Sequence, residues 1–283
     1  MTYRLPISLA TIGLAAVLAP AAHAATDIAT EAKAVTVSAA GDTYAYSSYA
    51  DGRYQLMIGA DKAHVATSKQ AFDVDLGTDA KGNLQAVYSL DGKIHEYDVA
   101  GGKDRTLSYR GTQPTIADGR IAYVRGTTLY LGKKAVFSGA KLRDPELSGS
   151  HLAFVTITDK DYVQNLRLQS LSGKSKVIYE ARSGGANDAS IVSPSFDASG
   201  KHLFWARRNM GSGQGNRYIR RTLSTGKTNY ALGTVDVYSL SWMGGSNGFA
   251  EVMTATRDDD PTAPGGPVVV KTTGALTFDA KAS

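Results

Sequence analysis

The chain has 283 residues, of which 31 are Lys or Arg, 26 are Asp or Glu and none is Cys, and its formal net charge is +5. A hydrophobic share of 42% and a charged share of 20% exclude a disordered low-complexity chain and a multi-span membrane protein. The lack of cysteine excludes disulfide scaffolds, thiolate zinc sites and cysteine nucleophiles. The 30 Gly and 15 Tyr residues, beside only eight Pro, favour short strands joined by tight turns, so we expect an all-β protein.

Residues 1–24 have the features of a cleavable signal peptide. Arg4 precedes an apolar run from Ile7 to Leu18, Pro20 ends that run, and Ala22-His23-Ala24 is a small-x-small cleavage site. The run is too short to span a bilayer, and the alternative is a short buried helix. We therefore expect a mature chain beginning near Ala25, secreted or periplasmic, without a transmembrane anchor. No Cys follows the apolar run, so a lipoprotein form is not expected.

A repeated unit fills the chain after this segment. An apolar strand runs into a turn that contains Gly, and a second strand of small, β-branched and aromatic residues follows. The copies are Val35–Tyr46, Phe72–Tyr88, Pro114–Tyr123, Pro145–Phe154, Pro194–Phe204 and Ser239–Val252. The steps between their turn glycines average about forty residues, the length of one four-stranded propeller blade.

A second repeated half follows the first, as a strand, a Gly-Lys turn and another strand. It occurs at Ile94–Leu107, Asn165–Ile178 and Arg217–Leu232, with shorter versions at Thr128–Lys133 and Val268–Gly274. Side chains alternate with the two-residue period of a strand. We therefore predict that residues 25–283 form one domain, a six-bladed β-propeller of four-stranded antiparallel blades. Either Asp27–Lys33 supplies the outer strand of the final blade, or Ala275–Asp279 does so alone.

These repeats resemble the TolB-type and WD-repeat-like propellers of bacterial exported proteins. Their repeat reads Pro-x-aromatic, a Ser-Pro-Asp-Gly turn, Lys-x-apolar-Ala-Phe, an apolar-Tyr strand and a Gly-Lys turn. Residues 194–204 match it best, with Asp197-Ala198-Ser199-Gly200 at the turn. The resemblance implies a propeller over nearly the whole mature chain. TolB carries a further N-terminal α/β domain, for which Ala25–Val35 leaves no room, so its translocation role and lipoprotein partner are not carried over.

One face of the expected ring carries long loops. Connections between the second and third strands share this face, which we call the loop face, with connections between blades. Those of the last three blades are long, at 158–162, 207–217 and 257–267, and a long inter-blade connection spans 182–188. Long loops on a rigid scaffold often bind ligands. The site residues we predict there are Asn187, Asp188, Arg207, Arg208, Arg217, Arg257, Asp258, Asp259 and Asp260.

Two features of these loops have competing interpretations. Asp258–Asp260 offers carboxylate oxygens for calcium, but the alternating ligand order of a calcium loop is absent, which favours solvated turn charge. Gly211–Gly215 looks like a phosphate loop but precedes a strand and lacks Gly-Lys-Ser/Thr, so nucleotide binding is not expected. Because neighbours on a strand point to opposite faces, we do not expect the arginines between 207 and 221 to form one cluster.

Enzymatic chemistry has fewer indications. Asp73 and Asp75 project from one face of an inner strand, where they form a paired acid site in the channel or satisfy backbone groups. The histidines fall in separate units without metal-ligand spacing, so we expect neither a metal nor a cofactor. The four that follow the signal segment are His64, His95, His151 and His202.

Two function classes remain. We favour a noncatalytic exported propeller, a monomer that binds a protein or an envelope-associated ligand. The alternative is a propeller hydrolase or lyase acting on a carbohydrate or other polar substrate in the central channel. Three or more convergent charged side chains in a deep channel favour the enzyme, and a channel plugged by Tyr, Leu and Val favours the binding module. No nucleic-acid partner is expected, because no run of five to eight Lys or Arg occurs.

Overall fold

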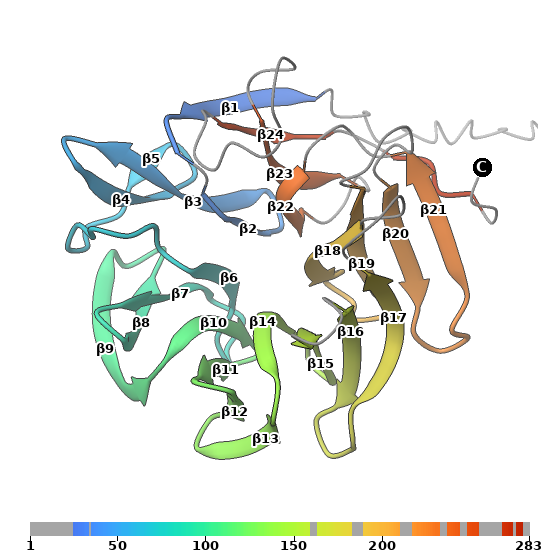
Figure 1. Ribbon diagram of the computed structural model, residues 1–283. Helices are drawn as coiled ribbons and strands as arrows, with labels where there is room; N and C mark the ends of the chain where they lie inside the picture. Colours follow the sequence, from blue (N-terminus) through green and yellow to red (C-terminus); the bar gives the residue numbers. More distant parts are fainter. Residues whose placement is uncertain are drawn as a thin grey trace, which may run out of the picture.

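The computed structural model describes residues 25–33, 35–158, 163–182, 189–209, 217–232, 237–243, 248–254, 268–273 and 276–279. These residues form 24 strands in six four-stranded antiparallel sheets, arranged as the blades of a ring (Figure 1). The predicted six-bladed β-propeller is therefore confirmed. Within the described ranges, no helix is long and apolar enough to cross a membrane. The predicted signal peptide, residues 1–24, lies outside them.

The first three blades are built from consecutive strands, which follow one another from the centre of the ring outward. Blade 1 consists of β2 (Val37–Ala40), β3 (Thr43–Ala50), β4 (Arg53–Ile58) and β5 (Asp61–Lys62). Blade 2 consists of β6 (Val74–Thr78), β7 (Leu84–Leu90), β8 (Lys93–Asp98) and β9 (Lys103–Arg110). Blade 3 consists of β10 (Thr112–Ala117), β11 (Arg120–Arg125), β12 (Thr128–Leu131) and β13 (Lys134–Ser138).

Blades 4 and 5 follow the same order, and blade 6 differs by taking its outer strand from the start of the chain. Blade 4 consists of β14 (Lys141–Leu147), β15 (His151–Thr158), β16 (Val163–Ser170) and β17 (Lys176–Arg182). Blade 5 consists of β18 (Ala189–Phe196), β19 (His202–Asn209), β20 (Arg217–Thr222) and β21 (Thr228–Leu232). Blade 6 consists of β22 (Val237–Trp242), β23 (Phe249–Thr254), β24 (Val268–Thr272) and, from the other end of the chain, β1 (Thr26–Glu31).

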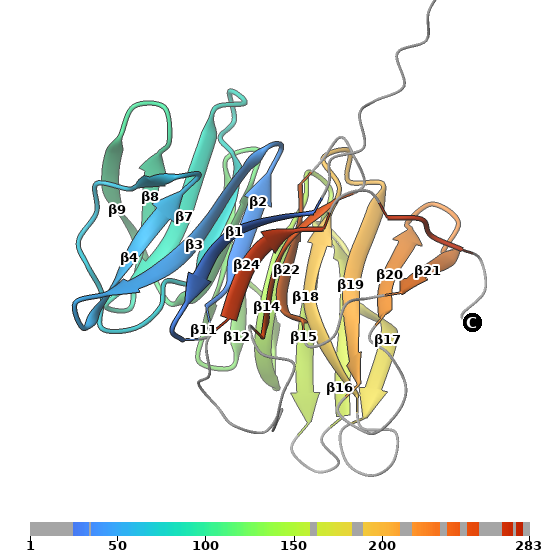
Figure 2. The ribbon, with the colours of Figure 1, turned by 90° about the horizontal axis from the view of Figure 1, so that it is seen from above.

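The ring is closed by β1, which pairs antiparallel with β24 (Figure 2). Glu31, at the end of β1, also reaches blade 1, because one of its carboxylate oxygens accepts the Tyr49 N–H at 2.9 Å. The Lys33 ammonium lies 4.2 Å from the centre of the Tyr49 ring. Of the two arrangements left open by the sequence, the N-terminal one is thus correct. Residues 276–279 lie against blade 5 instead.

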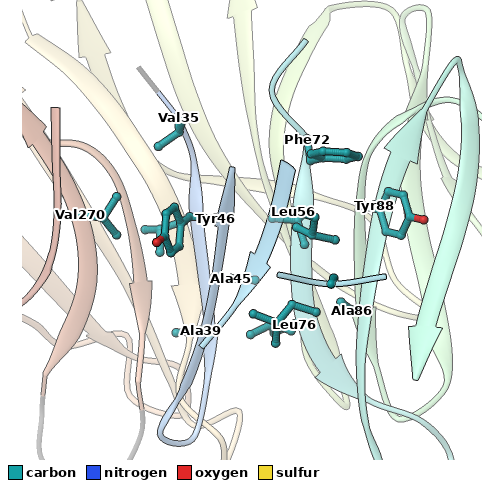
Figure 3. Close-up of a cluster of buried hydrophobic side chains, with 14 of the residues drawn as sticks. Val35, Ala39, Ala45, Tyr46, Leu56, Phe72, Leu76, Ala86, Tyr88 and Val270 are labelled. Atoms are coloured by element: carbon teal, nitrogen blue, oxygen red, sulfur yellow. The ribbon is translucent and has the colours of Figure 1, made fainter. Parts of the chain in front are cut away.

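The hydrophobic core lies between neighbouring blades, because each sheet buries both faces against the next. Figure 3 shows the cluster shared by blades 6, 1 and 2, with Val270, Leu56 and Tyr88 contributed by the three blades in that order. Phe72 packs edge-on against Tyr88 with 5.5 Å between ring centres. Because both faces are covered, strands such as β7, β8 and β11 have continuous buried stretches rather than burial at every second residue.

The turns between first and second strands use glycine as the repeats predict. Gly119 has φ of 72°, and a Cβ there would lie 2.8 Å from the Ala80 backbone nitrogen of blade 2. Only glycine therefore fits both the left-handed backbone and the close approach of the two blades.

Candidate functional site: the central channel

The first strands of the six blades, β2, β6, β10, β14, β18 and β22, line the central channel (Figure 1). Each is the inner edge of its sheet, so every second N–H group on that edge points away from its own blade. A buried N–H group without an acceptor costs free energy comparable to a lost hydrogen bond. These inner-edge donors therefore need acceptors from outside their own sheet.

Each blade supplies one such acceptor, a Ser, Thr, Asp or Glu side chain that receives the inner-edge N–H of a neighbouring blade. The bonds are Leu76 N to Ser38 Oγ (2.8 Å), Ile116 N to Asp75 Oδ2 (2.9 Å), Leu147 N to Thr115 Oγ1 (3.0 Å), Phe196 N to the Glu146 carboxylate, Trp242 N to Ser195 Oγ (2.9 Å) and Ala39 N to Ser241 Oγ (2.9 Å). In each blade, the residue whose side chain accepts is followed in the sequence by the residue whose N–H donates to the preceding blade. The six bonds therefore close a circle, which we call the inter-blade ring.

On three of these inner edges, proline occupies the previous position whose N–H would point toward the channel. Pro114, Pro145 and Pro194 lie two residues before the ring donors of blades 3, 4 and 5, where another residue would point a second N–H at the channel. Proline has no N–H, so no acceptor is needed there. In blade 1 this position is Val37, whose N–H donates to Ser239 Oγ at 3.1 Å. The repeated Pro of the sequence thus has a structural reason.

The residue before each of these prolines lies in a β-bulge with a left-handed backbone. Gln113, Asp144 and Ser193 have φ of 50°, 49° and 31°, a conformation that costs a non-glycine residue about 1 kcal/mol or more. Their N–H groups extend the bonding between blades. Gln113 N donates to Asp73 Oδ2 at 3.3 Å, Asp144 N to Gln113 Oε1 at 2.9 Å, and Ser193 N to the Asp144 carboxylate. Bulges of this kind commonly reorient side chains beside functional sites.

The channel contains two cavities of very different size. The neck, of about 90 Å³, lies toward the starts of the first strands and is lined by Thr36, Asp73, Asp75, Gln113, Asp144, Glu146, Ser193 and Ser239, among others. The funnel, of about 660 Å³, lies at the turns between first and second strands. Its lining includes Ala39, Leu76, Ile116, Leu147, Phe196 and Trp242, with Thr78, Asp118, Ser150 and Ser199 from the strand ends and turns. Glu146 borders both cavities.

Four carboxyl groups meet in the neck, and burial raises the pKa of each. The pKa of Asp75 rises to about 6, although Ile116 N, Ser38 Oγ and Thr115 Oγ1 donate to its carboxylate. Burial, and next the charge of Asp75, hold the pKa of Glu146 well above its usual range. Burial raises the pKa of Asp73, although the hydrogen bond from the Gln113 N–H acts to lower it. Burial also raises the pKa of Asp144, although the Arg143 guanidinium, 3.2 Å away, acts to lower it.

The sequence predicted part of this group. Asp73 and Asp75 both accept N–H groups from blade 3, so they project from one face of the strand as expected. Sequence reasoning missed Asp144 and Glu146. A signal existed, because Pro145-Glu146 stands where Pro114-Thr115 and Pro194-Ser195 stand in the neighbouring repeats. Alignment of the six repeats would have shown one polar residue at the same buried position in each.

Of the nine predicted loop-face residues, the structure describes three, and all three lie in strands. Arg207 and Arg208 lie near the end of β19, which runs to Asn209, and Arg217 begins β20, so residues 207–209 of the expected loop belong to the strand. Arg207 and Arg217 are cross-strand neighbours near Tyr179 of blade 4. Burial raises the pKa of the Tyr179 hydroxyl, and the charges of the two arginines only partly offset this increase. Alternation places Arg208 on the opposite face.

Asn187, Asp188, Arg257, Asp258, Asp259 and Asp260 lie outside the described residues, as does Gly211–Gly215.

The histidines are separated as expected. His95 Nδ1 lies 3.2 Å from Asp104 Oδ2 in blade 2, and His202 Nδ1 lies 2.9 Å from Asp197 Oδ2 in blade 5. His151 Nδ1 lies 2.7 Å from Ser150 Oγ in blade 4. Each therefore has a partner within its own blade.

Comparison with known proteins gives a fold but no family. No family model matches the chain, and no curated protein does. Among solved structures, TolB from Acinetobacter baumannii is similar at 14% identity, over 82% of this chain and 61% of the TolB chain, with a TM-score of 0.49. An oligogalacturonate lyase from Vibrio parahaemolyticus is similar at 9% identity, over 79% and 70% of the two chains, with a TM-score of 0.50.

The WD40 domain of Toxoplasma gondii coronin is similar at 9% identity, over 89% of this chain and 86% of that domain's chain, with a TM-score of 0.46. This chain spans less than two thirds of the TolB chain. At such identities a structural likeness shows the fold alone. The blade topology makes the chain a β-propeller, the fold that its repeats predict, and the TolB and WD40 structures are similar to it in fold.

Proposed function

We propose that the protein is an exported, noncatalytic β-propeller that binds a protein or an envelope-associated ligand, and that the ligand enters the funnel. The contrast between the two channel cavities carries this proposal. Pockets for small ligands usually measure about 300–1,000 Å³. The funnel, at about 660 Å³, lies in this range, and the neck, at about 90 Å³, lies far below it.

The neck supports this proposal over the alternative of a hydrolase or lyase. It holds four carboxyl groups, which meets the number of charged side chains expected of an enzyme. Each of the four, however, accepts a backbone N–H of the neighbouring blade. A glycoside hydrolase needs two carboxyls placed on either side of a scissile bond, with room for the sugar between them. In the neck the carboxyls hold blades together, and a cavity of its size does not admit a sugar ring.

Export belongs to the same proposal. Removal of residues 1–24 would yield a mature, monomeric domain of residues 25–283 in the periplasm or outside the cell. The ring-closing strand β1 begins at Thr26, just beyond the predicted cleavage site, so cleavage would leave it intact.

The loop face stays a second proposed contact surface. Arg207, Arg208 and Arg217 are its described candidates, because all three lie at or next to strand ends on this face.

The test compares a protein whose funnel is filled with one altered on an outer strand. Ser150→Trp places a large ring in the funnel, and Ser108→Trp places the same ring on the exposed β9 strand. Both are used as bait in an envelope extract beside the wild type. We expect Ser150→Trp alone to lose the retained ligand.

Retention that survives Ser150→Trp but is lost on alanine substitution of Arg207, Arg208, Arg217 and Asp258–Asp260 would move the site to the loop face. No retained ligand, together with glycan turnover abolished by Asp75→Asn, would overturn the proposal in favour of the enzyme.

A further inference from the structure

A short C-terminal segment lies along the outer edge of blade 5. Residues 276–279 run beside β21, where Tyr230 N donates to the Asp279 carbonyl at 2.8 Å and Asp279 N donates to the Tyr230 carbonyl at 2.7 Å (Figure 1). This is the antiparallel pairing of an added strand. A sheet edge offers such pairing to any extended chain that reaches it.

The side chains of the segment alternate in the manner of a docked strand. Leu276 and Phe278 pack against the cluster between blades 5 and 6, whereas Thr277 and Asp279 are exposed. The Phe278 ring lies 5.8 Å from that of the buried Phe204. The Arg220 guanidinium lies 4.8 Å from the centre of the Phe278 ring. The segment therefore presents an apolar-x-aromatic-x pattern to a site formed by β21, Phe204 and Arg220, which we call the blade-5 edge.

The blade-5 edge offers more bonding positions than residues 276–279 occupy. In an antiparallel edge strand, alternate residues point both backbone groups outward. The backbone N–H and C=O of Tyr230 point outward, and so do those of Thr228 and Leu232, two residues away on either side. Among the described residues, only Tyr230 forms a bridge to the segment. Arg220 Nε is also buried without a hydrogen-bond partner within the described part of the chain. A longer strand would pair with three residues instead of one and could place an acceptor near Arg220.

We propose that the blade-5 edge is a docking site for an extended strand of a partner protein, with an apolar-x-aromatic-x pattern, and that residues 276–279 occupy it intramolecularly until the partner displaces them. The occupant's chemistry follows from the segment already seated there. Affinity comes from main-chain bonds to β21, and selectivity comes from the aromatic side chain over Phe204 and beneath Arg220. The site is separate from the funnel and does not depend on the function proposed for it.

The test uses the full chain with Phe278→Ser, which weakens the intramolecular occupant, and a fluorescent peptide with the sequence of residues 274–281. Peptide binding is followed by fluorescence anisotropy. Because the wild-type edge is occupied at high effective concentration, we expect the variant to bind the peptide at least about tenfold more tightly than the wild type. Thr277→Ala in the full chain is the matched control, since Thr277 is exposed, and should bind as the wild type does.

Altered peptides test the mode of binding. A peptide with Phe278→Ala loses the aromatic anchor, and one with Asp279→Pro loses the N–H that donates to Tyr230, so neither should bind. A peptide with Thr277→Ala should bind unchanged. Leu276→Ala in the full chain is the milder variant if Phe278→Ser does not fold. Equal peptide binding, or none, by a folded variant and the wild type would overturn the proposal. So would a variant dimer that the peptide dissociates, because the edge would then serve a second copy of this chain.

Discussion

The buried carboxyl of Asp75 makes the stability of the propeller depend on pH in a calculable way. Its pKa rises from 3.8 to about 6 in the folded protein, because burial outweighs the hydrogen bonds that its carboxylate accepts. The folded state therefore holds this proton more tightly than the unfolded state. Asp75 costs no stability below pH 3.8 and costs progressively more as the pH rises to 6. With about 1.4 kcal/mol per pKa unit, the full cost above pH 6 is about 3 kcal/mol.

Asp75→Asn removes this effect, and it also removes the charge that raises the pKa of Glu146, which shifts stability in the same direction. Asn cannot accept every bond that Asp75 accepts, so the variant loses some stability at all pH values. That loss is constant and cancels in a comparison across pH. Part of the cost is already present at pH 4, so we expect the free energy of unfolding of the variant, relative to wild type, to increase by about 2.5 kcal/mol between pH 4 and pH 8. Urea unfolding followed by fluorescence of the buried Trp205 and Trp242 measures it. A difference between the two proteins that does not change with pH would refute the reasoning.

Three further predictions concern the inter-blade ring, its closure and its turns. Glu146→Gln keeps an acceptor for the Phe196 N–H and removes a charge beside Asp75. The melting temperature of the variant should therefore exceed that of wild type at pH 8 and match it at pH 5. An equal decrease at both pH values would contradict this. Deletion of residues 25–34 removes β1 from blade 6 and should lower the melting temperature by roughly 10 °C or more, as expected for a loss of several kcal/mol; an unchanged thermal transition would show that closure does not depend on β1. Gly119→Ala should destabilise by about 1 kcal/mol more than Gly41→Ala, because both have positive φ but only the new methyl at 119 meets the Ala80 backbone; equal losses in urea unfolding would exclude this clash.

The sequence predicts the blades because the signals for them are local. Each strand pair needs only alternating side chains and a turn glycine between them, as in Pro194–Phe204 around Gly200. The sequence left two arrangements open for ring closure, by Asp27–Lys33 or by the C-terminal segment. Local signals could not decide between them, because β1 pairs with a strand more than 230 residues away. Nothing within either segment distinguishes the two.

The candidate site was predictable only in part, since its geometry depends on contacts between blades. That Asp73 and Asp75 share a face follows from strand alternation. The proximity of Glu146 to Asp75 does not, because the two lie in blades 2 and 4 and meet only across the closed ring. The funnel, too, exists only when the turns of several blades converge.

Site-specific photo-crosslinking tests the central claim most directly, namely that the protein binds a ligand in the funnel. A photoreactive residue is placed at Ser199, which lines the funnel, or at Thr106, which is exposed on the outer strand β9, and the protein is irradiated in an envelope extract. We expect one discrete crosslinked species from position 199, lost when Ser150→Trp fills the funnel, and none from position 106. Identical crosslinking from the two positions, or crosslinks at 199 that persist with Ser150→Trp, would contradict the claim.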